Sequence, residues 1–598
     1  MKIFSSFALC GLFTKALSYL NRYSFIQFII KVREKIRYNT SYHSWIAKNE
    51  PSKSDICLKS YKLRSNPNIS LVVPIYNTPR KFLTQMINSV LGQTYPHWEL
   101  CISDGGSTEP QVKAILEQYA KRNRKIKIKF LRENKGITSN TNEAISLATG
   151  EYIAFLDHDD TLSPFALFEV VKAINKYPKA DLIYSDEDKI SENGKKRFDP
   201  YFKPDWNPDL LRSTNYIGHL TVIKKELLEK VGYLDPRFEG SQDYDLVLKA
   251  SEKATQIVHI PQILYHRRIH GGSVAQDPEQ KMYAYEAAQR ALEEHLRRIG
   301  RNGTVKSLPI LGLYKVTYEL SRFPLVSIII PTANNALLKK CVNSIIQKTA
   351  YKNWEIIVVN TNLKDEAIYN YCSTLAKNNS KIKFLTWNDK FFNFARVNNF
   401  AARYSKGEIL LFLNDDTEVI NNDWLERMVE HALREEVGAV GAKLYYPNGR
   451  IQHAGIIVGG EGIAIHLHKF FHRKSYGYFG RLMAIQNVSA VTGACLMIRK
   501  KVFEEVGEFD ERFSLAFNDV DLCLSLRKKG YLIVWTPHAE LYHHESKTRG
   551  YEDTPEKRAR FKVESELFLQ KWKEELTSAD PYYNPNLNPK RGDFSIKV

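Results

Sequence analysis

The chain has 598 residues, of which 43% are hydrophobic and 26% charged, and its formal net charge is +19. This length is too great for one hydrophobic core and predicts two to four domains, and the composition is that of an ordinary globular protein. The seven cysteines contain no C-x-x-C pair, so neither a zinc knuckle nor a disulfide framework is indicated, and we expect a reduced, cytosol-facing protein. The basic surplus favours anionic partners such as phosphates, a membrane surface or nucleic acid, although a lysine-rich solvated surface explains it equally well.

The first 65 residues read as a basic leader. Its apolar stretch, Ile3 to Thr14, is interrupted by Lys15 after about twelve residues, whereas a spanning helix needs roughly 20. No small-x-small cleavage site follows, which argues against a signal peptide. We expect a partly amphipathic helix that either lies on a membrane surface or packs on the body of the protein.

A strand-helix-strand series begins at residue 69. The β-rich run 69–77 (ISLVVPIYN) is followed by an amphipathic stretch over 81–92 and a second apolar run over 98–103. After another helical stretch comes GEYIAFLDHDDTL, residues 150–162, in which a strand ends in acids. This order predicts a parallel sheet wrapped by helices, with ligands bound at the carboxyl ends of its strands.

The whole series recurs in the second half of the chain. Residues 326–334 (VSIIIPTAN) repeat the first strand and 407–419 (GEILLFLNDDTEV) repeat the acidic one, and we place about 18 extra residues of the second copy around 446–481. A helix over 280–299 and a strand over 310–320 connect the copies, and the Pro- and Asn-rich tail reads as irregular. The predicted segments are a leader, two α/β domains with a linker between them, and a tail: 1–65, 66–278, 279–323, 324–577 and 578–598.

The acids at the end of the third strand predict a metal-diphosphate site. Unpaired carboxylates at a buried strand edge are costly, so they need a cation. Asp157 and Asp159 form a D-x-D, which suits Mg²⁺ or Mn²⁺ together with substrate phosphates, although a lone D-x-D is also common in surface turns. In the second copy the neutral Asn414 replaces the first acid, so that site depends on Asp415 and Asp416.

Further polar residues recur in both copies. Asp104, before a Gly-Gly-Ser turn, can accept a hydrogen bond from a nucleotide, although it also fits ordinary turn chemistry, and Asn360 is its counterpart. Asp243 and Asp519 occupy matching places in the segments QDYDL and NDVDL, and they are either general bases or helix caps.

Histidines near the end of each copy are candidate metal ligands. When the two Leu-Tyr-His triplets are aligned, His266 matches His543, one place beyond the register that aligns Asp243 with Asp519. A neutral imidazole can complete a metal shell. His270 and His544 compete for this role, and a purely structural histidine is the alternative.

These motifs, in this order, resemble the family 2 glycosyltransferases of the GT-A fold, in the tandem form found in bacterial O-antigen and cell-surface polysaccharide assembly. The resemblance covers roughly residues 69–275 and 325–550. It implies two Rossmann-like, mainly parallel α/β domains that transfer a sugar with inversion and with Mn²⁺ or Mg²⁺. It also implies three sets of residues: bases Asp243 and Asp519; nucleotide-sugar contacts Pro74, Tyr76, Asp104, Asp157, Pro331, Asn360 and Asn414; metal ligands Asp157, Asp159, His266, His270, Asp415, Asp416, His543 and His544. The family usually has a second acid after Asp104, where this chain has Gly105, so the preference for a nucleotide stays open.

The sequence therefore predicts a bifunctional enzyme that uses nucleotide-diphosphate sugars and a lipid-linked or polysaccharide acceptor. We expect it in the cytoplasm, peripheral on the inner face of the cell membrane. The alternatives are a chain with one active and one glycan-binding domain, or a non-catalytic binding protein. No basic-aromatic nucleic-acid module is present, and no G-x-G-x-x-G follows the first strands, which disfavours nucleic-acid binding and a dinucleotide oxidoreductase.

Overall fold

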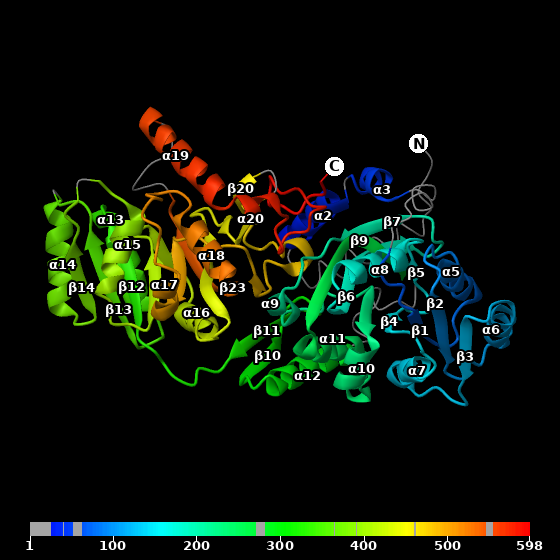
Figure 1. Ribbon diagram of the computed structural model, residues 1–598. Coiled ribbons are helices and arrows are strands. Elements are labelled where there is room, and N and C mark those ends of the chain that lie inside the picture. Colours follow the sequence, from blue (N-terminus) through cyan, green and yellow to red (C-terminus); the bar gives the residue numbers. More distant parts are fainter. Residues whose placement is uncertain are drawn as a thin grey trace. The chain divides into compact units, whose positions relative to one another are not determined.

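The computed structural model describes residues 25–597, except 40, 52–62, 271–281, 364, 390, 460–461 and 546–553. The chain forms two compact units, each considered by itself (Figure 1). The N-terminal unit contains Ser41–Glu319, Pro581–Leu587 and Lys597. The C-terminal unit contains Leu320–Asp580, Asn588–Ile596 and the helix α2 (Phe25–Asn39).

A mainly parallel half and a mixed half make up the sheet of the N-terminal unit. Its strand order is β3-β2-β1-β4-β8-β6-β9-β5, with β7 paired to β6. The strands β3, β2, β1 and β4 run parallel, while β8 is antiparallel to both of its neighbours. The strand bounds are β1 Ile69–Ile75, β2 Trp98–Asp104, β3 Ile126–Phe130, β4 Tyr152–Phe155, β5 Thr161–Leu162, β6 Ala180–Ser191, β7 Arg197–Tyr201, β8 Thr221–Lys224 and β9 Gln256–Ile269.

Helices cover this sheet because their apolar residues recur at helical spacing. In α5, Leu83, Met86, Ile87 and Val90 form one buried stripe, and β1 is buried along its whole length, as a central parallel strand requires. Beyond the sheet, α12 and the hairpin β10–β11 occupy the region predicted as a linker. The bounds are α3 Tyr42–Asn49, α5 Arg80–Leu91, α6 Pro110–Arg122, α7 Gly136–Ile145, α8 Ala166–Lys176, α9 Pro208–Leu211, α10 Lys225–Val231, α11 Gln242–Lys253, α12 Met282–Arg298, β10 Gly303–Ser307 and β11 Tyr314–Tyr318.

The C-terminal unit repeats this topology strand for strand, in the order β14-β13-β12-β15-β22-β17-β23-β16. Its strands are β12 Val326–Thr332, β13 Trp354–Asn360, β14 Ile382–Thr386, β15 Ile409–Leu413, β16 Thr417–Val419, β17 Val437–Tyr445, β22 Cys495–Arg499 and β23 Leu532–His543. Its helices are α13 Asn335–Lys348, α14 Glu366–Asn378, α15 Phe394–Arg403, α16 Trp424–Ala432, α17 Lys500–Glu505, α18 Asn518–Lys528, α19 Pro555–Lys571 and α20 Lys573–Thr577. Each unit therefore has the predicted α/β architecture.

Extra strands of the C-terminal unit fall within or beside the region where the extra residues were placed. They lie between β17 and β22: β21 extends the main sheet, and β19 and β20 form a separate hairpin. The strand β18 pairs with β17 as β7 pairs with β6, so it is the counterpart of β7. Their bounds are β18 Ile451–His453, β19 Ile456–Gly459, β20 Gly462–His466 and β21 Gln486–Asn487.

The two ends of the chain are each divided between the units. In the predicted leader, α2 belongs to the C-terminal unit and α3 to the N-terminal unit, where Trp45 packs on Phe202 with ring centroids 4.9 Å apart. In the tail, Asn584 donates hydrogen bonds to both carboxylate oxygens of Asp186, at 2.9 and 3.1 Å. The tail is thus irregular but anchored.

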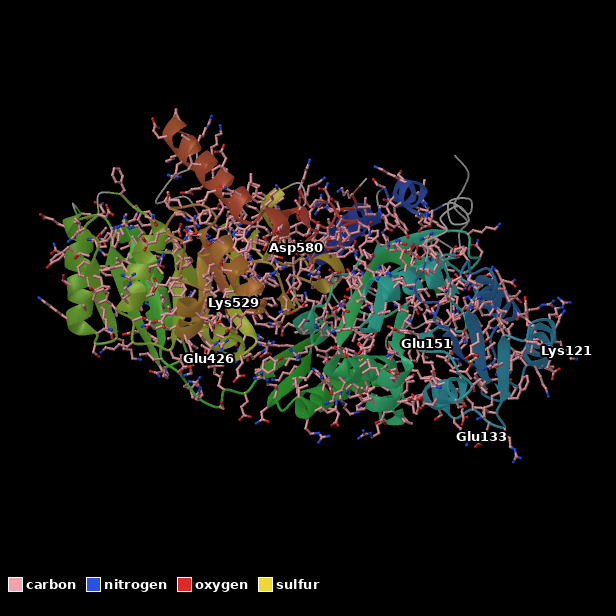
Figure 2. The ribbon with its side chains drawn as sticks, in the orientation of Figure 1. Lys121, Glu133, Glu151, Glu426, Lys529 and Asp580 are labelled. Atoms are coloured by element: carbon pink, nitrogen blue, oxygen red, sulfur yellow. The ribbon has the colours of Figure 1, made fainter. Side chains whose placement is uncertain are left out.

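Charged side chains such as Lys121 and Glu133 extend from the outside of the layers (Figure 2). Within the described ranges, no helix combines the length and the apolar composition that crossing a bilayer requires.

Candidate active sites

The acidic loop of the N-terminal unit follows β4 and is held by β9. Asp160 is buried and accepts hydrogen bonds from the Tyr265 hydroxyl (2.8 Å) and the Arg268 backbone amide (2.6 Å). Burial, together with the charges of Asp157 and Asp159, raises its pKa. Asp160 is therefore an anchor for the loop, which leaves the D-x-D carboxylates at its rim.

Asp159 and His270 form a polar pair at this rim. His270 Nε2 lies 2.7 Å from Asp159 Oδ2. The side chain of His270 is 19% exposed and that of Asp159 is 18% exposed. A partly exposed carboxylate beside an imidazole can be reached by a cation from solvent. The structure therefore brings together two of the residues predicted as metal ligands.

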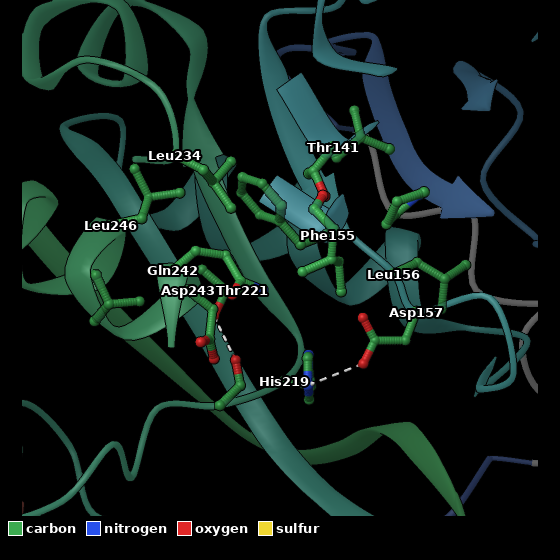
Figure 3. Close-up of a pocket in the computed structure, with 15 residues that line it drawn as sticks. Thr141, Phe155, Leu156, Asp157, His219, Thr221, Leu234, Gln242, Asp243 and Leu246 are labelled. Carbon is green, nitrogen blue, oxygen red and sulfur yellow. Dashed lines mark hydrogen bonds and ion pairs between the residues drawn. The ribbon is translucent and has the colours of Figure 1, made fainter. Parts of the chain in front are cut away.

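A pocket with an empty volume of about 520 Å³, including open solvent at its mouth, adjoins the loop. Asp157 and Asp243 both line it, and Figure 3 shows His219 between them in this view. His219 Nε2 is 3.6 Å from Asp157 Oδ2, and its ring stacks on Tyr265 with centroids 4.5 Å apart. Pro74, near the carboxyl end of β1, also lines the pocket.

Asp243 lies in the first turn of α11 and lines the pocket from this helix N-terminus. It accepts a hydrogen bond from the Asn215 side-chain amide at 3.0 Å. Burial raises the pKa of Asp243, and the charge of His219 and the backbone amide of Tyr244 oppose that rise. Asp245, the second acid of QDYDL, is instead an ion-pair partner of Lys249 at 3.1 Å.

His266 is engaged away from the rim. Its Nδ1 is 2.6 Å from Asp188 Oδ1 and its Nε2 is 2.9 Å from the Ser163 hydroxyl. Both ring nitrogens are used by these contacts, so the geometry favours His270 over His266 as a metal ligand.

The predicted nucleotide contacts lie at the ends of β1 and β2. Asp104 is buried, and its Oδ1 accepts the Ser107 amide at 3.1 Å and the Ser107 hydroxyl at 2.5 Å, which is turn chemistry. Tyr76, by contrast, is 43% exposed. Both residues stand at the edge where ligands bind to parallel sheets.

The C-terminal unit places its acids at the equivalent edge. Asp416 Oδ1 is 3.2 Å from His543 Nε2, and the Thr332 hydroxyl donates to Asp415 Oδ2 at 2.7 Å. His544 Nε2 lies 3.5 Å from Glu418 Oε2. Asp415 therefore contacts β12, whereas Asp416 and His543 form a carboxylate-imidazole pair comparable to that of Asp159 and His270.

The other predicted site residues of the C-terminal unit include two that accept hydrogen bonds from backbone amides. Asp519 Oδ2 accepts the Gly493 amide at 2.8 Å, and burial raises its pKa. Asn360 is buried at the end of β13, where its Oδ1 accepts the Asn362 amide at 2.9 Å. The predicted nucleotide contact Asn414 directly follows β15, and the predicted contact Pro331 lies on β12.

The two units differ around their candidate bases. At the position of His219 the C-terminal unit has Ala494, and at that of Ile137 it has Phe394. A Cβ placed on Gly493 would lie 3.3 Å from Phe394 Cζ and 3.5 Å from Asp519 Cβ. An aromatic ring thus stands near Asp519, where the N-terminal unit has an aliphatic side chain.

Sequence reasoning missed His219, because its motif is not repeated. Aligning IGHLTVIKK, residues 217–225, with TGACLMIRK, residues 492–500, would have drawn attention to a histidine present in one copy alone. Its position between two candidate acids depends on long-range folding, which no local pattern indicates.

The donor sets suit a hard divalent cation. Among the described residues, no group of three or more His, Cys, Asp or Glu is placed to hold a metal ion. Each unit nevertheless has a carboxylate-imidazole pair that includes the second acid of its strand-end cluster, Asp159 with His270 and Asp416 with His543. In the C-terminal unit, Asp416 Oδ1 has no hydrogen-bond partner besides its contact with His543, and His543 Nδ1 is buried without one. Mg²⁺-type sites often use one or two carboxylates and complete the shell with phosphates and water. The residues present therefore fit such an ion bound together with a diphosphate.

The fold and these sites define a duplicated α/β protein with polar side chains gathered at the carboxyl ends of its parallel strands. A family model described as Glycosyl transferase family 2 matches residues 70–232 and 327–507, more than half of the chain. The chain belongs to this family, and the prediction of two GT-A domains is confirmed.

Several known proteins are similar to this chain. An uncharacterised protein, y4gI, of Sinorhizobium fredii is 46% identical over 90% of this chain and 59% of its own length. The O-antigen biosynthesis protein RfbC of Myxococcus xanthus is 37% identical over 93% of this chain and 43% of its own. The chain thus spans about half the length of these relatives. Among solved structures, S. aureus TarS is 22% identical, with 38% of this chain and 65% of that chain covered and a TM-score of 0.32.

Proposed function

We propose that this protein transfers sugars, with inversion, from nucleotide-diphosphate donors to hydroxyl groups of a growing cell-surface glycan. One observation carries the proposal: in the N-terminal unit, a D-x-D carboxylate and a half-buried carboxylate on a helix, Asp157 and Asp243, line the same pocket. Family membership supports sugar transfer, and the O-antigen role of the Myxococcus relative supports a surface glycan as product.

Asp243 is the general base of the proposed reaction. Its carboxylate takes the proton of the acceptor hydroxyl as that oxygen attacks the anomeric carbon, and the carbon–oxygen bond to the diphosphate breaks on the opposite face. Attack and departure on opposite faces invert the configuration, so no covalent enzyme intermediate is needed. His219 lies within 3.6 Å of Asp157 and helps to orient that carboxylate.

Asp159 and His270 hold the divalent ion, with Asp157 directed to the ribose and diphosphate. The bound ion supplies charge stabilisation for the departing diphosphate. Tyr76, Pro74 and Asp104, at the ends of β1 and β2, receive the nucleotide.

The C-terminal unit performs a second transfer, with Asp519 as base and with Asp416 and His543 at the metal. The alternative is a degenerate unit that binds glycan without catalysis. Two sequence differences support this alternative. Asn414 stands where the N-terminal unit has Asp157, and Ala494 stands where it has His219.

Separate replacement of Asp159 and Asp416 by Ala tests both versions. The full chain is assayed for release of nucleoside diphosphate and for glycan product, with a panel of sugar nucleotides, Mn²⁺ or Mg²⁺, and a mixture of lipid-linked acceptors. Glu117→Ala, an exposed change on α6, is the control. Loss from both variants supports two active units, loss from one supports the alternative, and wild-type protein that turns over no sugar nucleotide contradicts the proposal.

With a lipid-linked acceptor, the protein works at the inner membrane surface, and α2 supplies a contact. Ile26, Ile29 and Val32 are 51%, 37% and 41% exposed at helical spacing, and basic residues outnumber acidic ones in the helix. Binding to anionic vesicles is expected to weaken in high salt and on replacement of Ile29 by Asp. Equal binding under all of these conditions would count against this contact.

A further inference from the structure

The hydrogen-bonded registers of β9 and β23 give an alignment of these two strands that differs from the alignment by amino-acid sequence. In the N-terminal unit Thr161 pairs with His266, and in the C-terminal unit Glu418, the counterpart of Thr161, pairs with Tyr542. A second pair of strands agrees: Asp188 of β6 pairs with His266, and Tyr445 of β17, the counterpart of Asp188, pairs with Tyr542. The alignment of the two Leu-Tyr-His triplets is therefore wrong by one residue.

A slip of one residue on a strand moves every side chain to the opposite face. The position of His543 is thus held in the N-terminal unit by Arg267, and His266 corresponds to Tyr542. Alignment by sequence matches the two histidines because Leu-Tyr-His recurs in the second copy shifted by one residue relative to the strand register.

Arg267 lies on the face of β9 that meets the acidic loop. Tyr265, two residues earlier and hence on the same face, contacts this loop through its hydroxyl, which accepts the Asp157 amide at 3.1 Å and donates to Asp160. Arg267 Nη1 is 3.5 Å from Glu187 Oε1, and Glu187 in turn accepts the backbone amide of His219 at 2.9 Å.

This guanidinium is both accessible and surrounded by acids. Its side chain is 43% exposed. Partial burial lowers its pKa, but the carboxylates of Glu187, Asp160 and Asp157 more than compensate, so the pKa of Arg267 is raised. A guanidinium is charged at every relevant pH and offers five N–H donors in a fork that fits two phosphate oxygens at once.

We infer that Arg267 binds the diphosphate of the donor in the N-terminal unit, from the strand position at which the C-terminal unit carries the metal-side residue His543. The inference rests on the proposed function and adds a partner for the diphosphate. Because the guanidinium is a permanent cation, the N-terminal unit retains nucleotide affinity when divalent ions are removed. The C-terminal unit, which has an imidazole there instead of a guanidinium, loses it.

The test measures nucleotide binding rather than turnover. Calorimetric titrations of UDP, GDP and dTDP are made on the full chain carrying Asp416→Ala, so that the N-terminal site dominates, in MnCl₂ and again in EDTA. Arg267→Gln removes the charge, Arg267→Lys retains it, and Arg124→Gln, an exposed arginine between α6 and β3, is the matched control. Thermal melting of each variant verifies folding.

In EDTA, Arg267→Gln is expected to weaken binding of the preferred nucleotide by about ten- to a hundredfold, the factor typical of one lost charge-assisted contact. Arg267→Lys is expected to recover part of this loss, and Arg124→Gln to bind like the parent chain. The inference is overturned if the parent loses all binding in EDTA, or if Arg267→Gln binds like Arg124→Gln. Absence of nucleotide binding even in MnCl₂ would instead contradict the proposed function.

Discussion

His259 is held between two carboxylates in the N-terminal unit, and this arrangement makes the stability of that unit depend on pH. Its Nδ1 is 2.9 Å from Asp205 Oδ1, its Nε2 is 2.9 Å from Asp186 Oδ1, and its side chain is 0% exposed. Because each ring nitrogen faces an acceptor, the ring carries both protons. Burial lowers the pKa of His259, but the two carboxylates outweigh it and raise the pKa to about 9.

The sign and size of the effect follow from proton linkage. The pKa of His259 rises from 6.5 in the unfolded chain to about 9 in the folded one. At about 1.36 kcal/mol for each pKa unit, the pair of contacts stabilises the fold by about 3 kcal/mol. This contribution is complete below the unfolded pKa of 6.5 and is lost as the pH rises through the folded value of about 9.

The perturbation is His259→Gln, compared with wild type and with the exposed change His97→Gln. Urea unfolding of the full chain at pH 6.5 and pH 9 is followed by hydrogen exchange in peptides from β6, which reports on this unit alone. The difference between wild type and His259→Gln is expected to be about 3 kcal/mol larger at pH 6.5 than at pH 9. Equal differences at both pH values would refute the argument, as would the same pH dependence in His97→Gln.

Three further predictions concern the same unit. Asp243→Asn is expected to lower transfer by about 10²–10⁴-fold with nucleotide binding intact, and wild-type transfer to rise with pH because burial raises the pKa of a base that works ionised; unchanged product formation would exclude this role. Asn584→Ala removes two hydrogen bonds to Asp186 and should lower the free energy of urea unfolding by about 1–3 kcal/mol, and an unchanged free energy would show that this contact of the tail does not stabilise the unit. Mn²⁺-dependent nucleotide binding should weaken in His270→Gln, whereas His266→Gln should lower the melting temperature and leave that binding unchanged; the reverse pattern would show that the two roles are exchanged.

The repeat and the strand-end acids made the architecture predictable from sequence. Apolar runs that end near Pro or Asp read as buried parallel strands, and the recurrence of the same motifs in the same order in both copies showed that the order of elements recurs. Such signals are local, so a pattern can carry them. The place of Asp157 beside a pocket follows from the rule that parallel strands bind ligands at their carboxyl ends.

What the sequence could not reveal depends on partners distant in the chain. Asp186, Glu187 and Asp188 form a run of three acids, yet all three are buried in β6. Each is compensated from elsewhere: Asp186 by His259, Glu187 by Lys203 at 3.0 Å, and Asp188 by His266 at 2.6 Å. The compensation of Asp188 also explains why His266 is unavailable to a metal.

The duplicated units have diverged most in the way each balances charge at its strand ends. The N-terminal unit combines Asp157 and Asp159 with a permanent cation, Arg267, whereas the C-terminal unit has an amide, Asn414, and an imidazole, His543, at the positions of Asp157 and Arg267. A site with fewer fixed charges of either sign binds a diphosphate mainly through the ion that accompanies it. Selection at these few positions can therefore alter metal dependence and donor affinity in one unit while the sheet and its packing stay the same.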